Sequence, residues 1–179
     1  ANRNVSGEWN ERGSNNLAGR IRTAEVDFEN GLIYCASSGG NIWRGSIDGE
    51  NWESMNDYMQ VKGISFLRLI DAEGISRLVV GSNDAFYYSD SDGLILNPTS
   101  GLENVNTIKR YALLGTDIYA LVKEWDSEDN RNETKLYRST DFGVSFQHFV
   151  SFDSHNGFNS IEMPDHFDLW TDRYFGGDV

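Results

Sequence analysis

The segment Ser139-Thr140-Asp141-Phe142-Gly143-Val144-Ser145-Phe146 decides the fold. An aspartate in a turn accepts hydrogen bonds from the backbone N–H groups that follow it. A glycine two residues later takes a positive φ where the chain reverses, and an aromatic residue at the end packs on the adjoining sheet. The segment therefore predicts a tight turn between two antiparallel strands, in which Ser139, Asp141, Gly143 and Phe146 have structural roles.

Two weaker copies of this segment precede it. Ser46-Ile47-Asp48-Gly49-Glu50-Asn51-Trp52 keeps the serine, aspartate, glycine and aromatic residue but is one residue short, so Ser46, Asp48 and Trp52 are assigned the same structural roles. Tyr88-Ser89-Asp90-Ser91-Asp92-Gly93 keeps the serine and the acidic turn but lacks the aromatic residue. The serines are 43 residues apart from 46 to 89 and 50 residues apart from 89 to 139. Repeats of about 40–50 residues with four short strands have the size of a β-propeller blade.

The residues between these turns read as short strands, and no apolar stripe of helical period exceeds two turns. The sequence therefore predicts an all-β fold, a β-propeller segment of about three to four four-stranded antiparallel blades within residues 1–179. The polar insertion 124–133 is predicted to be a loop, residues 94–96 a strand, and 161–170 a single strand. The expected blades are 9–57, 58–101 and 102–151, followed by a partial blade at 152–179.

The expected number of blades has a consequence for the whole molecule. A propeller ring closes by pairing its first and last blades, because open sheet edges invite aggregation. Three and a half blades do not close such a ring. We therefore expect the segment to be incomplete, with the remainder of a longer chain or another protein chain as its partner.

The eight-residue segment fits Ser-x-Asp-x-Gly-x-Ser/Thr-Trp/Phe and is identified as an Asp-box, or BNR repeat. Residues 9–57 resemble the opening blade of large exported bacterial propeller proteins, and related blades occur in sortilin-like domains and xyloglucanases. The resemblance implies a secreted or cell-surface protein, including the class carried by type IX secretion, and Ala1 in place of methionine fits a processed chain. The resemblance is carried by Trp9–Gly13, Gly19–Arg22, Ile33–Ala36, Gly39–Arg44, Trp52 and Asn56–Asp57.

The enzymes of this wider group have residues that we do not find here. Sialidases require three arginines, an acidic residue and a Tyr/Glu pair; Arg20 is similar to the first arginine, but the set cannot be assembled. Xyloglucanases place an acid in a turn that reads Ser37-Ser38-Gly39-Gly40 in this chain. We therefore assign no catalytic residue and expect a scaffold or recognition segment, seen alone or as cargo or partner in a larger assembly. The alternative is part of a glycoside hydrolase whose catalytic residues lie mostly outside this chain.

Composition restricts the ligands. A net charge of −13 disfavours nucleic acids and anionic membrane surfaces, and no apolar stretch approaches the ~20 residues of a membrane-spanning helix. Exposed aromatic residues stack on sugars, which makes Trp125 and Trp170 the candidate contacts for a glycan. The single cysteine, Cys35, lies in an apolar run that predicts a buried, inert thiol.

The sequence indicates no cofactor and no metal site. His148, His155 and His166 do not have the spacing of zinc ligands. Asp90-Ser91-Asp92-Gly93 begins like a calcium loop, but the later ligands do not follow. Weak calcium binding by the acidic stretch 124–133 is the one alternative.

Overall fold

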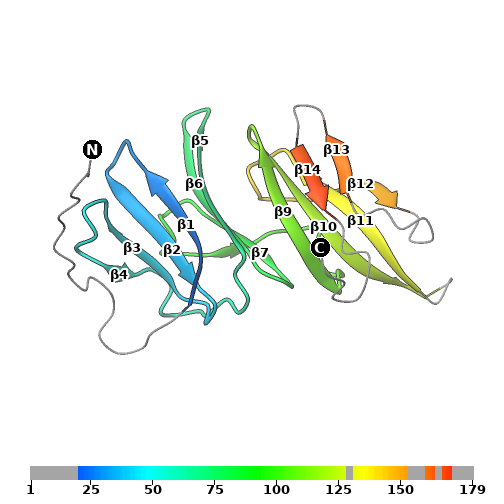
Figure 1. Cartoon of the computed structure of the whole chain (residues 1–179), viewed down its shortest axis with the longest axis horizontal. Helices are drawn as coiled ribbons and strands as arrows, with labels where there is room; N and C mark the ends of the chain where they lie inside the picture. The colour runs from blue at the N-terminus through cyan, green and yellow to red at the C-terminus, as the bar shows by residue number, and fades with distance from the viewer. Residues whose placement is uncertain (1–19, 128–130, 153–159, 164–166, 171–179) are drawn as a thin grey trace, which may run out of the picture.

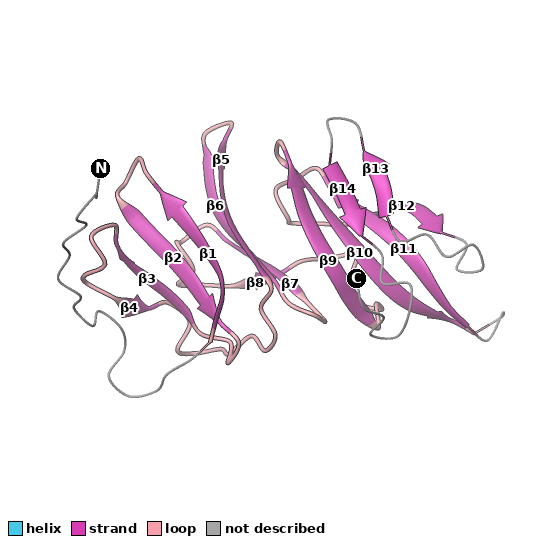
Figure 2. Cartoon of the chain, in the orientation of Figure 1, coloured by secondary structure: helices cyan, strands magenta, loops and turns pink. Residues whose placement is uncertain are grey.

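The computed structural model describes residues 20–127, 131–152, 160–163 and 167–170, and among these there is no helix (Figure 1, Figure 2). The described residues form three four-stranded antiparallel sheets and one two-stranded sheet, each with its strands in chain order. The first sheet contains β1 (Ile21–Asp27), β2 (Leu32–Ser37), β3 (Ile42–Ser46) and β4 (Glu53–Ser54). The second contains β5 (Phe66–Ala72), β6 (Ile75–Gly81), β7 (Phe86–Ser89) and β8 (Asn97–Pro98). The third contains β9 (Thr107–Leu114), β10 (Asp117–Asp126), β11 (Arg131–Ser139) and β12 (Gln147–Phe152), and the pair contains β13 (Ser160–Met163) and β14 (Phe167–Trp170).

The three large sheets stand face to face in a row (Figure 1). The first strands of the first two sheets, β1 and β5, contact each other, and β14 lies against β9, the first strand of the third sheet. This arrangement confirms the predicted all-β fold of consecutive four-stranded antiparallel sheets.

Two apolar cores separate the three large sheets, because alternate residues of a strand point to opposite faces, and a third cluster of Ala112, Tyr119, Leu121 and Leu136 lies on the other face of the third sheet. In β6, Leu78 and Val80 are buried against the first sheet, whereas Val79 between them is buried against the third sheet. The middle sheet is therefore apolar on both faces. The first core is centred on Tyr34, Ile42, Ile64, Leu67, Leu78 and Val80. The second is centred on Phe66, Val79, Phe86, Ile118, Val122 and Phe146.

Three local predictions were wrong. Residues 94–96 still belong to the turn, since the Ile95 N–H donates to Ser91 Oγ (3.1 Å), and the strand begins at Asn97. In the stretch 124–133, predicted to be a loop, residues 124–126 and 131–133 extend the β10–β11 hairpin, with Glu124 opposite Glu133 and Trp125 opposite Asn132. The single strand predicted at 161–170 is the β13–β14 pair.

Some predicted features lie outside the described residues. These are Ala1, the stretch 9–19 of the first predicted blade, His155 and His166. Trp170 ends β14, and only its place in that strand is described. The described sheets span 21–54, 66–98 and 107–152.

Candidate functional site

The β11–β12 turn holds the segment from Ser139 to Phe146. The Asp141 carboxylate accepts hydrogen bonds from Ser139 Oγ (2.7 Å), from the Ser145 N–H (2.9 Å) and from Ser145 Oγ (2.6 Å). Ser139 Oγ in turn accepts from the Gly143 N–H at 2.9 Å, and Gly143 has φ +87°. The aspartate thus closes the turn by a hydrogen-bond network among its own residues.

This network controls the ionisation of Asp141. Partial burial by itself raises the pKa of the carboxyl group. The hydrogen bonds from Ser145 and Ser139 stabilise the charged form and outweigh burial, so the pKa of Asp141 lies below its ordinary value. The carboxylate therefore stays ionised at neutral pH as a structural acceptor.

The same turn packs into the second sheet. A Cβ atom on Gly143 would lie 2.7 Å from Cε1 of Phe86, so only glycine fits there. The buried rings of Phe146 and Phe86 meet edge to face at 5.0 Å. From the second sheet, Arg77 donates to the carbonyl of Asp141 at 3.1 Å. The β11–β12 turn is therefore a joint between consecutive sheets.

The β7–β8 turn repeats this geometry with other residues. The Gly93 N–H donates to Ser89 Oγ at 2.9 Å, and Gly93 has φ +94°. Ser91 takes the place of Asp141 as acceptor, and buried Leu96 takes the place of Phe146. Our sequence interpretation required an aromatic residue and missed Leu96, although both positions lie seven residues after the serine.

In the β3–β4 turn, the position equivalent to Ser139 lies one residue earlier than the sequence pattern predicted. Ser89 pairs across the strands with Leu78, and Ser139 pairs with Ile118; both of these partners face the preceding sheet. Ser46 instead pairs with Leu32, which packs toward the following sheet. The strand register therefore makes Gly45 the counterpart of Ser139, with Trp52 seven residues later.

In this turn the predicted Ser46 and Asp48 form a local network of their own. Ser46 Oγ and the Glu50 N–H both donate to Asp48. A Cβ on Gly45 would lie 2.6 Å from the indole of Trp52, so the ring covers the glycine directly. Trp52 Nε1 also donates to the carbonyl of Gly49 at 2.9 Å. The turn is thus closed by the tryptophan together with the Ser46–Asp48 hydrogen bonds.

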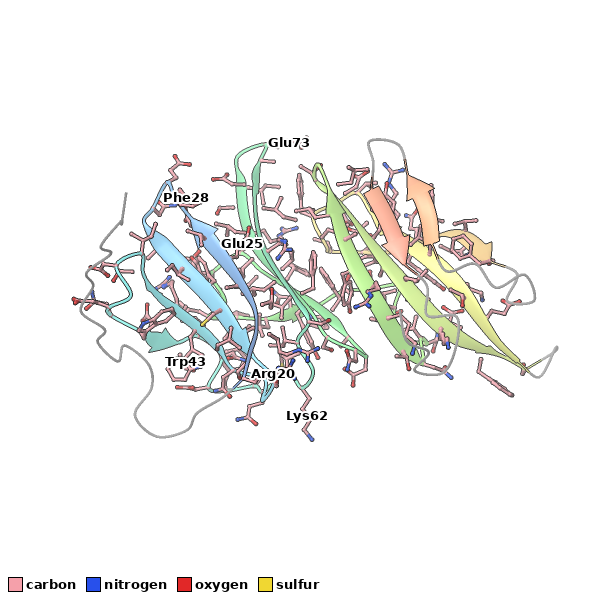
Figure 3. The ribbon with its side chains drawn as sticks, viewed as in Figure 1. Arg20, Glu25, Phe28, Trp43, Lys62 and Glu73 are labelled. Carbon is pink, nitrogen blue, oxygen red and sulfur yellow. The ribbon has the colours of Figure 1, made fainter. Side chains whose placement is uncertain are left out.

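Several arginines lie along these joints. Arg44 donates to Glu53 on the neighbouring strand and to Asp92 in the β7–β8 turn of the next sheet at 3.0 Å. Arg77 pairs with Asp90 at 2.6 Å, and Arg138 pairs with Asp117. These three guanidinium groups are therefore engaged with carboxylates. Arg20 lies exposed just before β1 (Figure 3), and its carbonyl accepts from the Ser38 N–H at 2.8 Å.

The two tryptophans predicted to contact a glycan lie on separate elements. Trp125 is near the end of the extended β10–β11 hairpin and is 50% exposed. Next to it, Glu124 accepts from Lys135 Nζ at 2.8 Å and from the Tyr137 hydroxyl at 2.5 Å. Burial and the neighbouring Glu124 carboxylate raise the pKa of Tyr137 to about 12. Trp170 belongs to β14, beside β9.

Buried Asn56 was noted in the sequence only as part of the resemblance of the first blade, with no role of its own. Its side-chain oxygen accepts from the Ile42 N–H at 2.7 Å, and its nitrogen donates to the carbonyls of Gly40 (2.8 Å) and Met59 (2.7 Å). It therefore ties β3 to the segment that leads into the second sheet. The sequence signal was an asparagine four residues after Trp52, which has no meaning until the fold is known.

The described part of the chain contains no group of three or more His, Cys, Asp or Glu side chains placed to hold a metal ion. His148 Nε2 lies 2.9 Å from Ser151 Oγ. Cys35 is half-buried, and burial raises the pKa of its thiol. Among the residues that the structure describes, no helix is long and apolar enough to span a membrane.

The fold has a counterpart among solved structures. The chain is similar to a chain in the crystal structure of a nidogen/laminin complex, with a TM-score of 0.51 and 15% sequence identity over 75% of this chain and 49% of that chain. The present chain thus spans about half the length of that neighbour. At this identity the likeness concerns the fold alone, and with the three four-stranded sheets it defines an all-β fold of the β-propeller type. No family model and no curated protein sequence matches the chain.

Proposed function

We propose that this chain is a non-catalytic propeller segment that acts as a scaffold or recognition surface of a secreted or cell-surface protein. The Asp-box resemblance suggests this class, including cargo of type IX secretion. The observation that carries the proposal is that these charged groups already take part in structural contacts. Asp141 closes a turn, and Arg44, Arg77 and Arg138 are paired with carboxylates at or near the sheet joints.

Recognition is assigned to the β10–β11 hairpin. The hairpin extends three residue pairs beyond the Lys123–Thr134 pair and presents the half-exposed indole of Trp125. Glu124, Lys135 and Tyr137 form a hydrogen-bonded group at its base. Because neighbours in a strand point to opposite faces, the Trp125 indole lies on the other face of the hairpin from this group, and the exposed ring alone supports the assignment, since aromatic rings stack on sugars. A glycan is therefore the proposed ligand, and bound calcium is not required.

The test is a glycan-array measurement with the 179-residue chain and two variants. Trp125→Ala should lose binding. Phe28→Ala should retain it, because Phe28 is an even more accessible aromatic residue (82% exposed, against 50% for Trp125) in the β1–β2 turn, at the opposite end of the strands (Figure 3). Equal binding by wild type and Trp125→Ala would contradict the assignment. Release of free sugar from sialosides or β-glucans would contradict the non-catalytic role and favour a glycoside hydrolase.

A further inference from the structure

The outer edge of the third sheet differs from the corresponding edges of the first two sheets. The strand orders place β4, β8 and β12 at the same end of their sheets, and each of these strands pairs with one neighbour. β4 (Glu53–Ser54) and β8 (Asn97–Pro98) are two residues long, whereas β12 (Gln147–Phe152) has six residues. Among the residues that the structure describes, β12 is therefore the longest outer edge strand (Figure 2).

This edge also lacks the features that usually protect an edge strand. Native proteins keep such strands short, or place proline or charged side chains on them. β4 and β8 follow this rule through their length, through Glu53 and through Pro98. β12 reads Gln-His-Phe-Val-Ser-Phe, with no proline, lysine, arginine, aspartate or glutamate. On a chain with a net charge of −13, it is an edge that a second chain of the same charge can approach closely.

The side chains of β12 are accessible along almost the whole strand. Five of its six residues are exposed, and the sixth, Phe152, is half-buried. The exposed residues include two large apolar side chains next to each other, Phe149 (50% exposed) and Val150 (36% exposed). Adjacent apolar side chains in contact with water on an unprotected edge indicate an interaction surface.

A register shift in β12 brings these two apolar side chains to one face of the sheet. Val150 pairs with Leu136, and Leu136 pairs with Leu121, so Val150 lies on the face that carries Tyr119. The shift leaves Phe149 without a pair, and its ring meets the ring of Tyr119 edge to face at 6.1 Å. Phe149 and Val150 therefore share a face although they are neighbours in sequence, as residues at a β-bulge do.

The polar side chains that flank them lie on the opposite face. His148 pairs with Tyr137, and the two rings meet edge to face at 5.8 Å. His148 Nε2 lies 2.9 Å from Ser151 Oγ. From His148 to Ser151 the strand reads polar, apolar, apolar, polar, and it has the same order in the reverse direction. This segment is therefore complementary to an antiparallel copy of itself.

We propose that two copies of this chain associate edge to edge through β12, antiparallel, about a twofold axis between Phe149 and Val150. In this register Phe149 lies opposite Val150 of the partner subunit, and His148 lies opposite Ser151 of the partner subunit. An axis perpendicular to the sheet keeps each face on its own side, so apolar side chains meet on one face and polar side chains on the other. The contact is isologous and gives a closed dimer, in which two four-stranded sheets become one sheet of eight strands.

Sedimentation of the 179-residue chain over a wide range of concentration tests the dimer. The mean mass should rise with concentration from 20.2 kDa to that of two copies and no further, because a twofold contact closes. Added salt should strengthen association, since it screens the repulsion between two chains of net charge −13. A mass that stays at 20.2 kDa at every concentration and salt, or one that grows beyond two copies, would overturn the proposal.

Charged variants locate the contact. Val150→Lys and Val150→Glu should each weaken association about tenfold or more, because the two copies of residue 150 bring like charges together beside the axis. An equimolar mixture of the two variants should associate again, as mixed dimers with opposite charges. Val26→Lys is the matched control, since it places the same charge at a valine of similar exposure (38%) in the first sheet, and it should have no effect. A mixture that stays monomeric, or an equal loss with Val26→Lys, would overturn the proposal.

Amide hydrogen exchange provides a second readout on the unaltered chain. Exchange within β12 should slow as the concentration rises, because its outward N–H groups become hydrogen-bonded to the second copy. The backbone of β4 should exchange at the same rate throughout. Unchanged exchange in β12 under conditions where the chain sediments as a dimer would place the contact elsewhere and overturn the proposal.

Discussion

Replacing Asp141 by alanine removes one acceptor of three hydrogen bonds, from Ser139 Oγ, the Ser145 N–H and Ser145 Oγ. A hydrogen bond to a charged group contributes about 1.5–3 kcal/mol. The three bonds share one carboxylate and their donors regain water in part, so their sum overstates the loss. We expect the free energy of unfolding to fall by about 2–4 kcal/mol. For a chain of this size, that corresponds to a fall in Tm of about 4–16 °C.

The pH dependence of this loss has a defined sign. The folded state lowers the pKa of Asp141, because its hydrogen bonds outweigh the effect of burial. A lowered pKa contributes stability above the unfolded value, about 3.9 for aspartate, and that stability is lost as the pH falls through the folded value. The difference in stability between the wild type and Asp141→Asn should therefore be full at neutral pH and shrink only below about pH 4.

The assay is equilibrium unfolding in urea, followed by tryptophan fluorescence and by circular dichroism. The matched control is Asp84→Ala in the β6–β7 turn, where the carboxylate accepts a single side-chain hydrogen bond, from Ser82 Oγ at 2.8 Å. Because Asp84 is exposed, the control should lose about 1.5 kcal/mol, the low end of the range for one hydrogen bond to a charged group. If Asp141→Ala were no more destabilised than Asp84→Ala, the carboxylate would not hold the turn, and our account of the joint would be refuted.

Three further outcomes follow from the same joints. Gly143→Ala should lower the free energy of unfolding by about 2–5 kcal/mol, and the control Gly115→Ala by about 1–2 kcal/mol. Gly115 also has a positive φ (+60°), but no atom lies within 4 Å of a Cβ added there. Equal losses of stability in thermal unfolding would show that Phe86 does not restrict the turn. Asn56→Ala should cost about 2–5 kcal/mol in urea unfolding, since it removes the side-chain partner of the Ile42 N–H and of the Met59 carbonyl and one of the two donors to the Gly40 carbonyl; a loss as small as that of a surface substitution would contradict this role. Ultraviolet titration of wild type minus Tyr137→Phe should show one phenol ionising near pH 12, and the stability from this raised pKa should be present below about pH 10 and lost as the pH rises through 12; ionisation near pH 10 would contradict the contact with Glu124.

Much of the fold was predictable because it rests on local signals. Asn30-Gly31 joins β1 to β2, and Asp141 with Gly143 joins β11 to β12, as such turn residues do in hairpins. Apolar residues then alternate within each strand. Strand ends were less predictable where a side chain competes with the sheet: Ser91 holds the Ile95 N–H and delays β8. The charged stretch 124–133 was read as a loop because the pattern does not show that Lys135 and Tyr137 satisfy Glu124 across the hairpin.

The correspondence between sheets required the strand registers as well as the sequence. A pattern search aligns Ser46 with Ser139 because it matches the residue type, but a shift of one residue in a strand moves every side chain to the opposite face. The registers align Gly45 instead, and only then do Ala24, Val26, Ile33, Cys35, Trp43 and Trp52 coincide with the buried positions of the other two sheets. In sequence order these six residues show no common period, since they come from three strands and a turn. Their shared face follows from pairing across the sheet, and it is therefore seen only in the structure.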